Sequence, residues 1–114
     1  MENEFVSYEQ AVALKELGFD EECLATYVGE VLDLTLQTLN DDYFTVAPLK
    51  QQVFRWFREK YEIHGFIIHY SRVMFRWCID SGDDFAESIK LDTYEEAENA
   101  CIDKLIELAK QQDK

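Results

Sequence analysis

Three capped helical patterns, separated by strand-like segments, constrain the fold of this chain most. The clearest is the last one, in which Thr93 can cap a helix and Glu96 stands at the capping-box position three residues later. Apolar residues then recur at helical spacing as far as Leu108. The pattern predicts a helix over residues 94–110.

Two earlier segments carry similar signals. Ser7 and Gln10 form a capping-box pair, and Gly18 provides a left-handed stop, which together predict a helix over residues 8–17. Pro48 suits the first turn of another helix. Apolar residues at steps of three and four continue that helix to about Tyr61.

The segment between the first two helices has the two-residue period of a half-buried strand. It predicts a hairpin of residues 23–28 and 31–38, with a turn at Gly29, although the leucines of the second strand also fit a helical face. The polar residues 40–42 then indicate a loop.

The segment after the second helix is rich in aromatic and β-branched residues. Residues 66–79 predict two strands with a bend near Ser71 and Arg72, and one long strand is the alternative because neither Gly nor Pro interrupts them. Residues 81–84 indicate a turn, and a short strand is expected over 87–91. The order α-ββ-α-ββ(β)-α predicts a single small α+β domain of residues 1–114, with a mostly antiparallel sheet packed by three helices.

Composition narrows the class of partner. The 114 residues include 11 Lys and Arg against 24 Asp and Glu, a net charge of −13, which argues against binding phosphate backbones across the whole surface. Neither a long apolar run nor a secretory signal is present, so we expect a cytoplasmic protein that does not enter a membrane. Three cysteines, Cys23, Cys78 and Cys101, suit reduced core residues better than a disulfide framework.

The charge is unevenly distributed. Residues 1–49 carry −10 and residues 77–114 carry −7, whereas residues 50–76 carry +4 and are rich in aromatic residues. Guanidinium groups bind phosphate and aromatic faces stack on bases, so this centre is a candidate site for a nucleotide or single-stranded nucleic acid. The candidate ligand-binding residues are Arg55, Arg58, Arg72, Arg76, Trp56 and Tyr70. The alternative is that the arginines pair with nearby acids and the aromatics fill the core.

The acidic ends suggest a different surface. On the last helix, Glu95, Glu96, Glu98 and Asp103 form a candidate face for a basic partner protein, by presenting carboxylates where DNA presents phosphates. Solubility and the helix dipole explain the same residues equally well. His64, His69 and Cys78 offer too few ligands for zinc, and we predict no metal, no cofactor and no catalytic residue.

Three sequence blocks resemble a family of small, largely uncharacterised proteins of bacteriophages and prophages from gut and related bacteria. The blocks contain SYEQA with LGFDE in residues 5–21, APLKQQVFRWFREKY in 47–61, and TYEEAENACIDKLIE in 93–107. The resemblance covers the three helices, nearly half the chain, and supplies no catalytic residue. It implies a phage accessory protein, a context in which small proteins often bind and disable a host defence component.

Our leading hypothesis is therefore a non-enzymatic protein that acts by binding, as an inhibitor of a host defence or regulatory protein. The alternative is a domain that binds a nucleotide signal or single-stranded nucleic acid through residues 50–77. In either case, an exposed edge strand or helix face is a possible homodimer contact.

Overall fold

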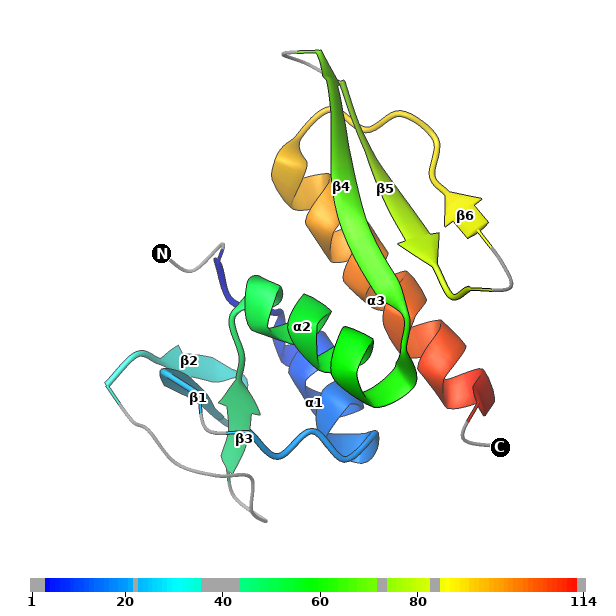
Figure 1. Cartoon of the computed structure of the whole chain (residues 1–114). Coiled ribbons are helices and arrows are strands. Elements are labelled where there is room, and N and C mark those ends of the chain that lie inside the picture. The colour runs from blue at the N-terminus through cyan, green and yellow to red at the C-terminus, as the bar shows by residue number, and fades with distance from the viewer. Residues whose placement is uncertain (1–3, 22, 36–43, 72–73, 83–84, 113–114) are drawn as a thin grey trace. The chain divides into compact units, whose positions relative to one another are not determined.

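The computed structural model describes residues 4–21, 23–35, 44–71, 74–82 and 85–112 (Figure 1). These residues form three α-helices and two three-stranded antiparallel sheets, which confirms the predicted α+β class. The strands thus divide between two sheets, where one sheet was expected. The chain also separates into two compact units, Met1–Lys50 and Gln51–Lys114, which we describe one at a time. The single-domain assignment stays a prediction.

The first unit begins with α1 (Tyr8–Glu16), which has the predicted caps. The Ser7 side chain accepts a hydrogen bond from the Gln10 amide at 3.2 Å, and the Gln10 side chain accepts one from the Ser7 amide at 3.0 Å. Gly18 has φ +96°, and the amide of Phe19 donates to the carbonyl of Leu14 at 2.9 Å, closing the carboxy-terminal end of the helix.

The sheet of the first unit has the order β2-β1-β3. The predicted hairpin is confirmed as β1 (Ala25–Val28) and β2 (Val31–Asp33), although β2 is shorter than predicted and residues 36–38 lie outside the described part of the chain. The sequence patterns missed β3 (Phe44–Ala47), which pairs with the other side of β1.

Tyr27 ties this sheet to the beginning of the chain. Its hydroxyl donates a hydrogen bond to the carbonyl of Val6 at 2.7 Å, and its ring lies edge-on to that of Tyr8, with centroids 5.4 Å apart. The amide of Val6 in turn donates to the carbonyl of Pro48 at 3.1 Å. The carbonyl and the amide of Val6, a buried residue, therefore both have hydrogen-bond partners.

The second unit contains α2 (Lys50–Tyr61), β4 (His64–Ser71), β5 (Met74–Asp80), β6 (Phe85–Glu87) and α3 (Tyr94–Gln112). Pro48 precedes α2, which begins two residues later than the sequence suggested. The two-strand interpretation of residues 66–79 is confirmed and the single long strand is wrong, because β4 and β5 pair as antiparallel neighbours. The predicted bend at Arg72 lies outside the described residues.

The sheet of the second unit has the order β4-β5-β6. The last strand covers residues 85–87, earlier than the predicted 87–91, but the chain beyond it stays along β5. Phe75 and Leu91 exchange two backbone hydrogen bonds of 2.9 and 2.8 Å, and the amide of Ser88 donates to the carbonyl of Trp77 at 3.0 Å. The side of β5 that faces away from β4 is therefore hydrogen-bonded along much of its length.

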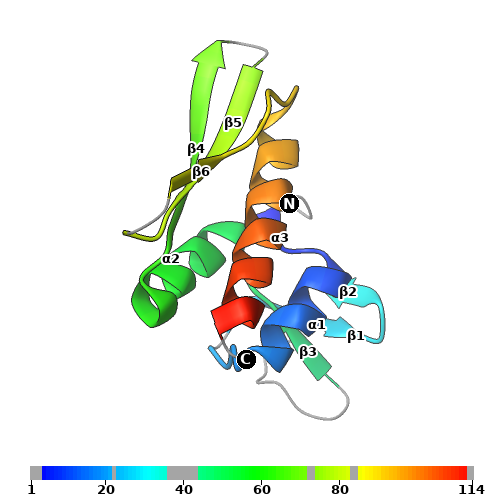
Figure 2. The same cartoon turned by 90° about the vertical axis from the view of Figure 1, so that its right-hand side faces the viewer.

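Helix α3 packs against one face of this sheet, as Figure 2 shows. Its amino-terminal cap is the predicted one, because the Thr93 hydroxyl accepts from the Glu96 amide at 3.1 Å. Gly65 permits close packing: a Cβ at this position would lie 3.0 Å from Leu105 Cδ1 and 3.1 Å from Cys101 Sγ. The core of the unit lies between α2, α3 and this face of the sheet.

Candidate functional site

The face of the β4-β5-β6 sheet that points away from α3 is the first candidate surface. Side chains alternate between faces along a strand. The register therefore places one set on this outer face, as far as its residues are described: His64, Phe66, Ile68, Arg76, Cys78, Asp80, Phe85 and Glu87. Phe66 is 43% exposed and Phe85 is 60% exposed. The outer face thus presents two aromatic rings to solvent.

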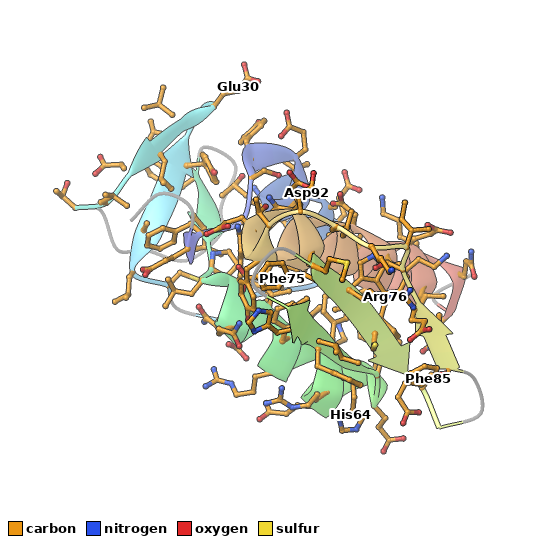
Figure 3. All side chains as sticks on the ribbon, turned by 90° about the horizontal axis from the view of Figure 1, so that it is seen from above. Glu30, His64, Phe75, Arg76, Phe85 and Asp92 are labelled. Carbon is orange, nitrogen blue, oxygen red and sulfur yellow. The ribbon has the colours of Figure 1, made fainter. Side chains whose placement is uncertain are left out.

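The charges of the outer face are partly neutralised within it. Arg76 Nη1 lies 3.1 Å from Glu87 Oε1 in an ion pair between β5 and β6, and Figure 3 labels Arg76 beside the β6 strand that carries Phe85. The Cys78 thiol donates to Glu87 Oε2 at 3.9 Å. Burial, and next the Glu87 charge, raise the pKa of this thiol above its usual value, so Cys78 stays protonated at neutral pH.

A pocket of about 260 Å³ lies along the β4 edge of the sheet, between α2, β4 and the start of α3. Arg58 and Gln51 of α2, Phe66 of β4 and Tyr94 of α3 contribute to its walls. The Gln51 side chain donates to the carboxylate of Glu98 at 3.0 Å. Burial, followed by the negative charge of Glu98, raises the pKa of Tyr94, so the pocket presents a neutral phenol beside the Arg58 guanidinium.

The predicted ligand-binding arginines that the structure describes lie at separate places in the second unit. Arg55 and Arg58 lie exposed on α2, and only Arg58 lines the pocket, whereas Arg76 is paired with Glu87 on the outer face. Arg72 and the side chain of Tyr70 lie outside the described residues.

Trp56 makes a poor stacking platform. It is only 6% exposed, its ring lies edge-on to that of Phe57 with centroids 5.1 Å apart, and Lys60 Nζ is 5.0 Å from the ring centroid. For this residue the structure favours the alternative we gave, in which the aromatics of the basic centre fill the core.

The predicted acidic face keeps three of its four residues at the surface. Glu95, Glu96 and Asp103 are exposed on α3. Glu98, which the sequence assigned to the same face, is 7% exposed and receives the hydrogen bond of Gln51. It follows buried Ala97 on the inner side of the helix, so it is unable to contribute to a surface for a partner.

The two histidines point to opposite faces of the sheet. His64 belongs to the outer face, whereas His69 alternates to the other and stacks on Phe75 with centroids 4.8 Å apart. Within the described ranges, no group of three or more His, Cys, Asp and Glu side chains is arranged to hold a metal ion.

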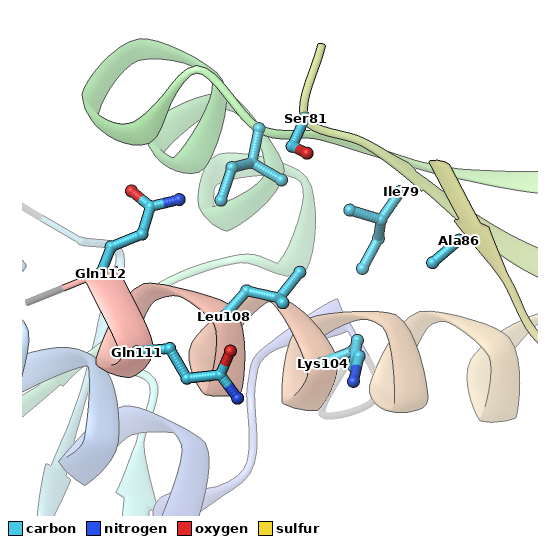
Figure 4. A pocket seen from close by; sticks show the side chains of 8 residues that line it. Ile79, Ser81, Ala86, Lys104, Leu108, Gln111 and Gln112 are labelled. Carbon is cyan, nitrogen blue, oxygen red and sulfur yellow. The ribbon is translucent and has the colours of Figure 1, made fainter. Parts of the chain in front are cut away.

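A second pocket, of about 300 Å³, opens between α3 and the β5-β6 side of the sheet (Figure 4). Ile79 and Leu108 form apolar walls, and Lys104, Gln111 and Gln112 supply polar groups. The ammonium of Lys104 already lies 3.3 Å from Glu107 Oε1. None of the residues predicted from sequence lines this pocket.

Sequence reasoning missed Phe66, Phe85 and Tyr94 as site residues. The outward position of Phe66 follows from a contact that only the structure shows: Gly65 packs against helix α3, and in a strand the neighbour of an inward residue points outward. Phe85 had no comparable signal, because its place on the outer face depends on pairing with Asp80 of β5.

Comparison with protein-family models, curated proteins and solved structures gives no match to this chain. The resemblance to bacteriophage proteins therefore stays a prediction. In the described part of the chain, none of the helices has the length and apolar character needed to cross a membrane.

Proposed function

We propose that this chain is a non-enzymatic binding protein that contacts a partner protein through the outer face of the β4-β5-β6 sheet. The observation that carries the proposal is the exposure of Phe66 and Phe85, at 43% and 60%, on one face of a sheet. Exposed aromatic residues are the side chains that most often dominate protein interfaces.

The charge on this face supports a protein partner. Arg76 and Glu87 pair with each other, so little net charge has to be desolvated when the surface is covered. Cys78 is a protonated thiol, which is a weak nucleophile, in keeping with binding in place of catalysis.

The three blocks that resemble bacteriophage proteins favour a host protein as the partner, with inhibition of a defence or regulatory component as the outcome. The exposed acids Glu95, Glu96 and Asp103 favour a partner with a basic surface. In this proposal the aromatic face provides affinity, and the acidic residues increase the rate of association.

The test is affinity capture from a bacterial host lysate, followed by measured binding of the captured protein. We expect Phe66→Ser and Phe85→Ser each to weaken binding by about tenfold or more. Val31→Ser, at a residue 70% exposed in the other unit, is the matched control and should leave binding unchanged. Binding that survives the Phe66→Ser, Phe85→Ser double variant, or capture of no protein, contradicts the proposal.

One observation favours a second candidate, the binding of a nucleotide. Arg58, Phe66 and Tyr94 line the same pocket, which combines a cation, an aromatic ring and a phenol in a space of about 260 Å³. Titration with adenosine monophosphate at low salt should show binding to the wild type. Arg58→Ala should abolish that binding, and Arg55→Ala, on the same helix, should leave it unchanged. Absence of binding at low salt excludes this candidate.

A further inference from the structure

The pocket of about 300 Å³ between α3 and the sheet of the second unit belongs to neither surface proposed above. Strands β5 and β6 supply one wall, the carboxy-terminal half of α3 supplies the opposite wall, and the turn after α2 contributes Ile63. In Figure 4, Ile79 and Ala86 of the sheet lie across the pocket from Leu108 of α3. All of its lining residues belong to the second unit.

A small side chain on β6 leaves this space open. Ala86 is the register partner of Ile79, so both side chains lie on the inner face of the sheet, toward α3. On α3, Lys104, Leu108 and Gln111 are spaced by four and three residues, which places them on one face of the helix. Ala86 extends only one carbon toward that face, so the space between β6 and α3 is not filled.

The apolar floor of the pocket is already in place. Ile63 and Ile79 line it and are themselves buried, so their side chains are fixed by packing. Glu62 has φ +57°, and the amide of Ile63 donates to the carbonyl of Phe57 at 3.3 Å, which fixes the turn that carries Ile63. A preformed site has little conformational entropy to lose when it binds a ligand.

The polar groups of the pocket favour a ligand with a negative charge. Lys104 is the only charged residue among those described as lining it, although the whole chain has a net charge of −13. Gln111 and Gln112 add side-chain amides, which can donate hydrogen bonds. A single ammonium group matches the single charge of a carboxylate, whereas phosphate is usually bound by arginines or by several backbone amides.

The ion pair of Lys104 does not close the site to such a ligand. Its ammonium lies 3.3 Å from Glu107 Oε1, and the two side chains are 33% and 56% exposed. Exposed ion pairs of this kind contribute little to stability. A ligand carboxylate can therefore take the place of Glu107 at a small cost.

We propose that this pocket binds a short aliphatic carboxylate, with the alkyl chain between Ile79, Ala86 and Leu108 and the carboxylate at Lys104. At roughly 30 Å³ for each non-hydrogen atom, about 300 Å³ accommodates about ten such atoms, the number in octanoate. For a ligand of this size we expect a dissociation constant on the order of 1 mM. The site is independent of the function proposed above, because Phe66 and Phe85 lie on the other face of the sheet.

The test is titration of the isotope-labelled full chain with octanoate, followed through the backbone amide NMR signals of Ile63, Ile79 and Ala86. We expect these signals to shift together and to saturate. Lys104→Met keeps an unbranched side chain without the ammonium and should weaken binding about fivefold. Lys110→Met removes the same charge from an exposed residue of α3 outside the pocket, so it is the matched control and should bind like the wild type.

A third variant tests the space itself. Ala86→Leu adds an isopropyl group where the alkyl chain would lie and should abolish binding in a chain that circular dichroism shows to be folded. The proposal is overturned if octanoate at about 10 mM, roughly ten times the expected dissociation constant, shifts none of the three signals. It is also overturned if Lys104→Met binds as tightly as Lys110→Met, or if folded Ala86→Leu binds like the wild type. Should Ala86→Leu fail to fold, the two lysine variants decide the outcome.

Discussion

The side chain of Gln51 donates a hydrogen bond to Glu98 over 3.0 Å, which joins the start of α2 to the first turns of α3. Glu98 is 7% exposed, so its carboxylate depends on such contacts in place of water. The same carboxylate is close enough to Tyr94 to affect its ionisation.

Replacing Gln51 by leucine should reduce the free energy of unfolding by about 1–3 kcal/mol, because a buried carboxylate loses a donor. Urea denaturation measures this change.

In Glu98→Gln the negative charge is removed, so the pKa of Tyr94 should fall, as followed by NMR titration of the tyrosine ring. A Tyr94 pKa that does not move would show that burial alone sets it.

Gly65→Ala should destabilise the fold by about 1–3 kcal/mol through overpacking. The new methyl group would lie 3.0 Å from Leu105 Cδ1, 3.1 Å from Cys101 Sγ and 3.3 Å from Phe54 Cδ1. Thermal unfolding in a Cys101→Ala background is the control, since removal of the sulfur gives Leu105 space to move. An equal loss in both backgrounds would contradict the steric explanation.

The alkaline stability of the chain should depend on Cys101. Burial raises the pKa of this thiol from 9.0 to about 12, so the folded state holds the proton more tightly than the unfolded state. The contribution is complete below pH 9.0 and is lost as pH rises toward 12. The free energy of unfolding should therefore fall by about 1.4 kcal/mol per pH unit more steeply in the wild type than in Cys101→Ala. Parallel urea curves for the two proteins above pH 9 would contradict this.

Ser7→Ala should cost about 1 kcal/mol, because it removes the side-chain half of the capping box of α1. Ser7 is exposed, so the substitution loses little packing. Ser7→Asp retains an acceptor for the Gln10 amide and should be close to the wild type in thermal unfolding. If both variants lose the same stability, the cap is not the cause.

The helices could be predicted because their signals are local. Ser7 with Gln10 and Thr93 with Glu96 are three residues apart, and each pair forms the hydrogen bond that its spacing predicts. The strand character of residues 66–79 also followed from composition, and their antiparallel pairing as β4 and β5 decided between two strands and one. Strand β3 was missed because four residues, FTVA, carry too short a pattern, and their strand character depends on pairing with β1, which lies well before them in the chain.

The candidate site was less predictable, because exposure is decided by contacts between elements. Trp56 and Phe66 belong to the same basic, aromatic stretch, yet one ring is nearly buried and the other is 43% exposed. Glu98 is likewise one of several acids on α3 and the one that contacts Gln51. The type of side chain does not tell which of these residues are buried and which are exposed. The packing of the second unit decides it.

Residues 85–91 make β5 the central strand of its sheet. They run along the side of β5 that faces away from β4, so β5 has backbone partners on both sides. Among the described strands, any further strand would therefore have to add beside β4 or beyond β6, and the side chains that β5 carries would keep their neighbours.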